Sequence, residues 1–133
     1  MSYSVKVSLG EILDKLSILE IKLSYAEEAV QIDNIKRELL HLETITRPLW
    51  DHNEGRLKQL YENLKSTNKK LWSIEDQLRL KEQEQDFGAE FVALARSVYI
   101  TNDQRAETKK QINKLLNSEF VEEKIYSNPN YAL

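Results

Sequence analysis

The chain of 133 residues contains no cysteine, which excludes disulfide bonds, thiolate metal ligands and cysteine nucleophiles. It has only three glycines and two prolines, too few for the closely spaced turns of a β-sandwich or β-barrel. No segment approaches the roughly 18 consecutive apolar residues of a membrane-spanning helix, and the N-terminus lacks the apolar stretch of a signal peptide. These absences favour a soluble all-α protein, and the missing cysteine is compatible with a cytoplasmic location.

Neither sign of charge dominates the chain. The 19 basic residues stand against 22 acidic ones, which gives a formal net charge of −3. A surface of this balance does not broadly attract nucleic acid or an anionic membrane, so we expect neither as a partner. The three glycines are isolated from one another, and the sequence has no Gly-rich phosphate-binding loop and no Gly-x-Ser-x-Gly elbow.

Apolar residues recur at helical spacing along most of the chain. Ser8 followed by Glu11 fits a capping box, in which each side chain bonds a free backbone N–H at the start of a helix. Pro48 marks a break between the second and third helices. The pattern predicts one domain over residues 1–133, divided into an extended arm (1–7), four helices (8–25, 27–44, 50–85 and 86–117) and a short helix with a tail (119–133).

The third predicted helix carries a heptad-like seam. Leu57, Leu64, Leu71 and Leu78 recur every seven residues, although polar residues interrupt some of the positions between them. Asp86 is the expected N-cap of the next helix, so helix 3 and helix 4 should form a long antiparallel hairpin that turns there. The expected fold is an all-α helical bundle, in which two N-terminal helices pack against this coiled-coil-like hairpin. A helix of ~50 Å is longer than the core of a small domain requires. This favours a homodimer in which a second copy covers the far end of the hairpin.

Polar residues interrupt the seam at one level of the hairpin. Arginines beside an aromatic ring suit a phosphate or carboxylate ligand, because guanidinium groups bind such anions through two hydrogen bonds. The alternative is a network of interhelical ion pairs that fixes the register of the hairpin, which is the commoner role of such residues. The candidate ligand-binding residues are Trp72, Glu75, Asp76, Arg79, Arg96, Tyr99, Asn102, Asp103 and Arg105.

Two motifs that would indicate a metal enzyme are incomplete. Glu38 and His41 have the Glu-x-x-His spacing of di-iron helices, but the other histidine, His52, has no glutamate three residues before it. Glu11 and Asp14 match half of the acidic signature of all-α nucleotide pyrophosphohydrolases, without the facing carboxylates that would hold magnesium. We therefore expect no metal site, no cofactor and no catalytic residue.

Three segments resemble signatures of a family of small all-helical bacterial and phage proteins of unknown function. They are residues 10–22 (GEILDKLSILEIK), 71–82 (LWSIEDQLRLKE) and 94–106 (LARSVYITNDQRA). Members resemble segments found near, or joined to, glycosyltransferase and tetratricopeptide-repeat proteins of surface-polysaccharide clusters. The resemblance covers nearly the whole chain and implies no catalytic residue. The charged residues of its first segment, Asp14 and Glu20 among them, are expected to contact the polar cluster or a partner subunit, unless they lie on a solvated flank.

Two hypotheses of function follow from these features. The first is a non-catalytic helical interaction or assembly protein, homodimeric and able to bind a protein partner, because the seam is long and no catalytic motif is complete. The second is a binding module or enzyme acting on an anionic metabolite, such as a nucleotide sugar of surface-polysaccharide metabolism. It depends on the arginines of the predicted cluster.

Overall fold

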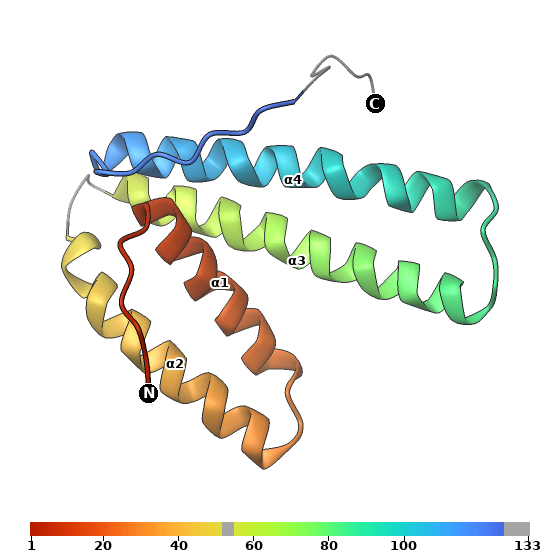
Figure 1. Ribbon diagram of the computed structural model, residues 1–133, viewed down its shortest axis with the longest axis horizontal. Coiled ribbons are helices and arrows are strands. Elements are labelled where there is room, and N and C mark those ends of the chain that lie inside the picture. Colours follow the sequence, from red (N-terminus) through yellow and green to blue (C-terminus); the bar gives the residue numbers. More distant parts are fainter. Residues whose placement is uncertain (52–54, 127–133) are drawn as a thin grey trace.

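The computed structural model describes residues 1–51 and 55–126, and every regular element in these ranges is helical (Figure 1). The helices α3 and α4 lie antiparallel, and the two N-terminal helices pack at one end of this pair. The expected all-α bundle built on a long hairpin is thus confirmed. The elements are α1 (Leu9–Tyr25), α2 (Ala29–Thr46), the 3₁₀ turn η1 (Arg47–Leu49), α3 (Arg56–Gln83) and α4 (Ala89–Leu115).

The start of α1 has the predicted cap but only half of the predicted capping box. Ser8 is the N-cap, and its Oγ accepts the backbone N–H of Glu11 at 3.2 Å. The carboxylate of Glu11 does not return to Ser8, because it reaches across to Nζ of Lys109 on α4 at 2.6 Å. A charge-assisted bond to an ammonium is stronger than a bond to a neutral backbone N–H.

The connection between α2 and α3 is longer than predicted. Pro48 lies in η1, and α3 begins at Arg56 rather than near residue 50. Gly55, the N-cap of α3, has a φ of 87°, a left-handed conformation that glycine adopts without steric cost. His52, the second histidine considered as a metal ligand, lies outside the described residues.

The hairpin turn also differs from the prediction. α3 ends at Gln83, and α4 begins directly after its N-cap, Gly88, so Asp86 does not cap the helix. The carboxylate of Asp86 instead accepts the backbone N–H of Gly88 at 3.2 Å and pairs with Lys81 at 3.1 Å. Aspartate commonly bonds a backbone N–H two residues later, and here that bond stabilises the turn rather than the helix.

The hydrophobic core lies at the end of the hairpin that the N-terminal helices cover. α1 contacts α2 on one side and both α3 and α4 on the other (Figure 1). Of the heptad leucines, Leu57 and Leu64 are buried in this core at 1% and 0% exposed, whereas Leu78 lies beyond it and is only half-buried. The core cluster consists of Leu13, Leu16, Leu19, Leu39, Leu57, Leu60, Tyr61, Leu64 and Ile112.

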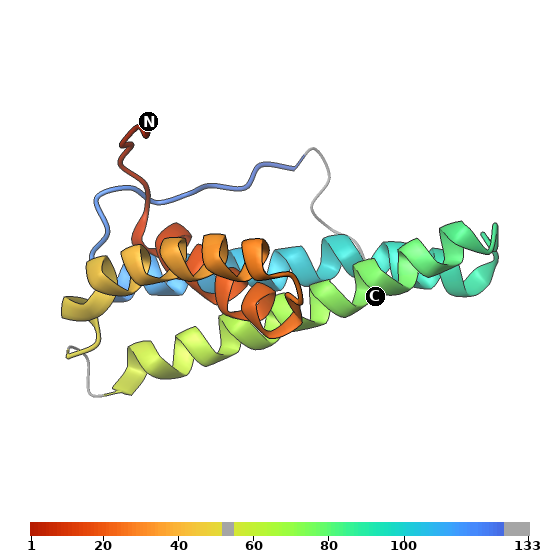
Figure 2. The same ribbon diagram turned by 90° about the horizontal axis from the view of Figure 1, so that it is seen from below.

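Beyond this core the hairpin continues as two helices alone, and both views show it projecting past α1 and α2 (Figures 1 and 2). We refer to residues 75–100 as the distal hairpin. The structure describes all of these residues and none of them is buried, whereas Thr101, which follows directly, is fully buried. Leu80, Phe87 and Val92 in the distal hairpin are 54%, 48% and 52% exposed.

An extended segment, residues 118–126, follows α4, and we call it the C-terminal strap. It runs back along α4, where a short helix was predicted from residue 119 (Figure 2). Glu122 pairs with Lys109 at 3.0 Å, and the hydroxyl of Tyr126 donates to Asp103 at 2.7 Å. These contacts with α4 hold the strap extended, because tertiary contacts readily override a weak helical propensity. The rest of the predicted tail lies outside the described residues.

Candidate functional site

Most of the buried polar side chains meet where α1 crosses α3 and α4. Asp14 of α1, which is 1% exposed, lies at the centre. Its two carboxylate oxygens accept hydrogen bonds from Nε and Nη2 of Arg105 on α4, the first at 2.9 Å. Nδ2 of Asn68 on α3 donates to the same carboxylate at 2.8 Å and to the hydroxyl of Ser17 at 2.8 Å. One aspartate therefore connects three helices, partly through charge-assisted bonds.

Lys109 extends this arrangement to the strap. Its Nζ lies 2.6 Å from Glu11, 3.0 Å from Glu122 and 3.9 Å from Asp14. Burial lowers the pKa of this ammonium, but its hydrogen bonds to Glu11 and Glu122 outweigh that effect and raise the pKa above its ordinary value. The bond from Lys109 lowers the pKa of Glu122, and the bond to Asp14 raises the pKa of Arg105. These shifts keep Lys109, Glu122 and Arg105 charged near neutral pH.

α1 and α4 are in close contact at Gly10. Its backbone N–H donates to Oδ1 of Asn113 at 2.6 Å. A Cβ at this position would lie 2.7 Å from the backbone oxygen of Lys109 and 2.9 Å from Oδ1 of Asn113. Glycine therefore permits the close crossing that brings Asp14, one helical turn later, to the cations of α4.

The buried polar cluster is better suited to fixing the register of the helices than to catalysis. Every carboxylate in it is paired with a cation, so none is left to act as a general base. The described residues contain no group of three or more histidine, aspartate or glutamate side chains that could hold a metal ion. Within the same residues, buried Oγ1 of Thr101 and Nδ2 of Asn113 lack a hydrogen-bond partner. The cluster comprises Glu11, Asp14, Ser17, Asn68, Arg105, Lys109 and Glu122.

A second polar contact joins α1 to α3 further along the crossing. Glu20 accepts a hydrogen bond from the hydroxyl of Tyr61 and pairs with Nζ of Lys65 at 2.6 Å. Burial, followed by the hydrogen bond to Glu20, raises the pKa of Tyr61 far above its ordinary value. The phenol therefore stays protonated and serves as a hydrogen-bond donor between the helices.

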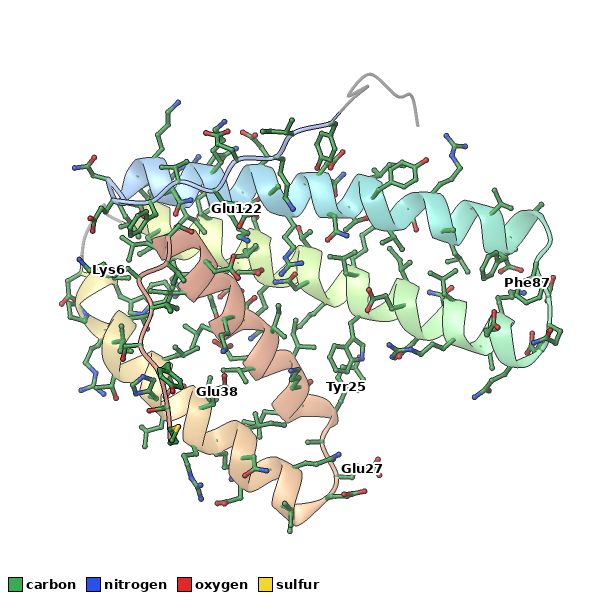
Figure 3. All side chains as sticks on the ribbon, in the orientation of Figure 1. Lys6, Tyr25, Glu27, Glu38, Phe87 and Glu122 are labelled. Atoms are coloured by element: carbon green, nitrogen blue, oxygen red, sulfur yellow. The ribbon has the colours of Figure 1, made fainter. Side chains whose placement is uncertain are left out.

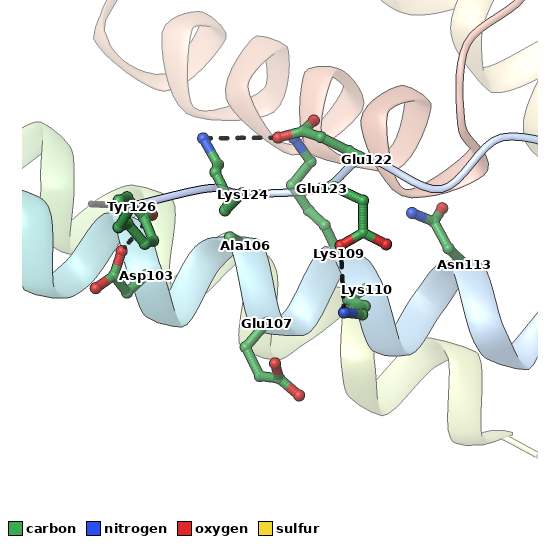
Figure 4. A pocket seen from close by; sticks show the side chains of 10 residues that line it. All are labelled: Asp103, Ala106, Glu107, Lys109, Lys110, Asn113, Glu122, Glu123, Lys124 and Tyr126. Atoms are coloured by element: carbon green, nitrogen blue, oxygen red, sulfur yellow. Dashed lines mark hydrogen bonds and ion pairs between the residues drawn. The ribbon is translucent and has the colours of Figure 1, made fainter. Parts of the chain in front are cut away.

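Two small clefts flank the strap beside the buried polar cluster. The larger, of about 280 Å³, lies between α4 and the strap and is lined by three lysines and four carboxylates (Figure 4). The smaller, of about 190 Å³, includes Arg105, Lys109 and Lys124 together with Glu11 and Glu122. Each lysine and arginine that lines these clefts is already paired with a carboxylate, so neither cleft presents a surface that attracts an anion strongly.

The residues predicted to form one ligand site are divided among three places. Trp72 stacks on Tyr25 of α1, with ring centroids 5.0 Å apart and ring planes 15° from parallel. Glu75, Asp76 and Arg79 are exposed on the α3 side of the distal hairpin. The α3 half of the predicted cluster is therefore split between an aromatic contact with α1 and the solvent-facing hairpin.

The predicted residues of α4 are divided as well. Arg96 and Tyr99 lie on the distal hairpin, where Nε of Arg96 donates to the hydroxyl of Tyr99 at 3.4 Å. Asn102 and Arg105 line the smaller cleft beside the strap, and Asp103 lines the larger one. The structure brings Arg105 to Asp14 of α1 rather than to the residues of α3. A contact of this kind was one of the outcomes expected for the charged residues of segment 10–22.

Lys109 and Ser17 belong to the buried polar cluster but were not among the predicted site residues. A signal for Lys109 exists, because Thr101, Arg105, Lys109 and Asn113 recur every four residues and so form a polar stripe on one face of α4. Ser17 follows Asp14 by three residues, which places both on one face of α1. Polar residues that recur on one face of a helix, among residues that are otherwise buried, are thus the sequence pattern that indicates the cluster.

The fold and the cluster define a class: an all-α hairpin domain whose first helix is locked onto the hairpin by buried polar groups. The chain belongs to a family of unknown function, DUF6165, whose profile matches residues 3–132. No curated protein and no solved structure matches the chain. None of the helices in the described part of the chain is long and apolar enough to cross a membrane.

Proposed function

We propose that the protein is a non-catalytic helical interaction module that assembles with a second copy through its distal hairpin. The burial profile carries this proposal: no residue of 75–100 is buried, although Leu80, Phe87 and Val92 are large and apolar. Two short helices alone bury too little apolar surface to be firmly stable in water. A second hairpin packed on the first completes a four-helix bundle and removes these side chains from solvent.

The charge distribution along the hairpin favours an antiparallel arrangement of the two copies. The distal hairpin has six acidic residues and three basic ones, whereas residues 56–74 of α3 have five basic residues and one acidic one. Residues 101–115 of α4 are also basic, with four basic residues against two acidic ones. An antiparallel two-fold dimer places the acidic tip of each hairpin beside the basic middle of the other, which is electrostatically favourable.

The exposed surface is large enough to accommodate such an interface. The chain exposes 9553 Å², whereas a compact monomer of 15.6 kDa exposes about 7,300 Å². The extended N-terminal arm and the C-terminal strap account for part of this excess. A standard stable interface buries ~800 Å² of each partner, which is less than the excess of exposed surface over that of a compact monomer.

Sedimentation equilibrium at micromolar concentrations tests the proposal. The wild-type chain is expected to sediment as a dimer, and the double variant Leu80→Glu/Val92→Glu as a 15.6 kDa monomer, because two carboxylates cannot be buried unpaired at the interface. Val30→Glu is the matched control, since Val30 is an exposed apolar residue of α2 outside the hairpin. It should remain dimeric. A wild-type monomer throughout this range, or a dimeric double variant with intact helicity, overturns the proposal.

Binding of an anionic metabolite at the predicted cluster has less support from the geometry. Asp14 neutralises Arg105, while Arg79 and Arg96 are exposed on different helices. It stays a prediction, as do a cytoplasmic location and a link to bacterial and phage surface-polysaccharide proteins. An Arg79→Ala/Arg96→Ala variant that responds to nucleotide sugars as the wild type does would remove its support.

A further inference from the structure

A cleft of about 460 Å³ opens at the turn between α1 and α2 and faces the middle of α3. Its lining comes from all three helices: Lys22 and Tyr25 from α1, Gln31 and Asn34 from α2, and Trp72 from α3. None of these residues belongs to the buried polar cluster or to the distal hairpin. The inference that follows is therefore independent of self-assembly.

One wall of the cleft is the stacked pair of Tyr25 and Trp72, whose ring centroids are 5.0 Å apart. Figure 3 places Tyr25 between the end of α1 and the helix α3. Tyr25 is nevertheless 59% exposed, so much of its ring contributes nothing to packing within the chain. An exposed, flat aromatic surface of this kind is what planar heteroaromatic rings stack on in proteins.

The polar side chains of the cleft are available to a ligand. Within the described chain, Gln31 and Asn34 make no side-chain hydrogen bond and Lys22 makes no ion pair. Side-chain amides both donate and accept hydrogen bonds, as the edge of a nucleobase requires. Lys22 is the one charged group among the described lining residues, so this cleft offers an unpaired cation, whereas the cations of the two clefts beside the strap are paired with carboxylates.

We propose that this cleft binds a planar heteroaromatic ligand that carries an anionic group, such as a mononucleotide. The ring stacks on the Tyr25–Trp72 pair, and the amides of Gln31 and Asn34 bind its polar edge. Lys22 pairs with the anionic group. The volume suits a single nucleotide, and the net charge of −3 on the chain opposes binding of a nucleic acid strand.

The two tryptophans make a selective test possible in the full chain. Trp72 lines the cleft, whereas Trp50 packs edge-on against Tyr61 of the core, with ring centroids 5.1 Å apart. Their indole N–H resonances are followed by NMR while adenosine or uridine monophosphate is added, with Trp50→Phe used for assignment. At least one nucleotide is expected to shift the Trp72 resonance saturably and leave Trp50 unchanged. Ribose phosphate, which lacks the ring, is expected to shift neither.

Substitutions in the cleft separate stacking from charge. Tyr25→Leu is expected to abolish the shift, whereas Tyr3→Leu, in the exposed N-terminal arm, leaves it intact. Lys22→Met should weaken mononucleotide binding about fivefold without affecting the uncharged nucleoside. Asn34→Ala is a second variant, outside the aromatic stack, and should weaken binding even if Tyr25→Leu loosens the turn.

Four results overturn the proposal. The first is a Trp72 resonance that responds to neither nucleotide at millimolar concentration. The second is an equal response to ribose phosphate. The third is undiminished binding in both Tyr25→Leu and Asn34→Ala. The fourth is a response to a single-stranded oligonucleotide alone, which would assign the surface to nucleic acid instead.

Discussion

The two ends of the α3–α4 hairpin are made by the same pair of helices but stabilised differently. At the covered end, α1 supplies both buried leucines and the aspartate that binds Asn68 and Arg105. At the distal end no third helix of the described residues is present, and no residue of 75–100 is buried. The pairing of α3 and α4 therefore continues past α1 and α2, but a third element is needed to bury the side chains between them.

Removing the central carboxylate should produce the largest difference between the two ends. Asp14→Ala leaves Arg105 and the buried amide of Asn68 without the carboxylate that they bond, and we expect it to lower the free energy of unfolding by about 3–5 kcal/mol. Asp76→Ala, the same change on the exposed distal hairpin, should alter it by less than about 0.5 kcal/mol. Urea denaturation followed by circular dichroism measures both. Equal effects would show that the cluster does not stabilise the covered end.

Truncation of leucines compares the apolar contributions of the two ends. Leu64→Ala opens a cavity at a fully buried position and should lower the free energy of unfolding by about 2–5 kcal/mol. Leu80→Ala, where the side chain is 54% exposed, should cost less than about 1 kcal/mol at dilute protein concentration. Urea denaturation followed by circular dichroism measures both changes in the free energy of unfolding. A cost for Leu80→Ala that matches Leu64→Ala would mean that the distal side chain is buried in the monomer.

Glycine substitutions test the close crossing of α1 and α4. A Cβ on Gly10 would lie 2.7 Å from the backbone oxygen of Lys109, which cannot easily move, so Gly10→Ala should cost about 1–3 kcal/mol. Gly88→Ala in the hairpin turn is the matched control, because its nearest contact would be an ordinary 3.4 Å. Since alanine is a poorer N-cap than glycine, Gly88→Ala should lower the melting temperature slightly, whereas Gly10→Ala should lower it more. Unchanged stability there would show that the helices separate easily.

The smallest expected effect concerns the strap and is pH-dependent. Lys109 lowers the pKa of Glu122 below its ordinary value of 4.5, so the pair contributes fully above that value and is lost as the pH falls through the lower folded-state pKa. Since Glu122 is 37% exposed, the contribution should be below about 1 kcal/mol. Strap resonances followed by NMR during acidification should show release. Glu122→Gln should release the strap at neutral pH, and a strap unaffected by both changes would contradict this role.

The paired helices could be predicted from the sequence because they depend on local periodicity. Leu57 and Leu64 follow the heptad spacing and are buried, and Ser8 caps the first helix as its residue type suggests. The boundaries were less accurate. Asp86 was expected to cap a helix but bonds within the turn, and aspartate suits both positions equally well.

The buried polar cluster could not be predicted as a unit because its members are far apart in sequence. Asp14 and Arg105 are separated by 91 residues, and no local pattern specifies that contact. Trp72 was assigned to a surface shared with α4, yet its ring stacks on Tyr25 of α1. Hairpin geometry predicts which residues of two helices lie level with each other, but it cannot predict which of them a third helix will meet.

The contact between Asp14 and Arg105 also sets an order of events during synthesis. At the usual rates of about 5–20 residues per second, Asp14 is added to the chain roughly 5–18 s before Arg105. Until then the first helix has a carboxylate with no cation to bury it against. Translation therefore yields a nascent chain whose first helix completes its packing only when the last helix has been made, and a ribosome stalled before Arg105 leaves Asp14 without its arginine.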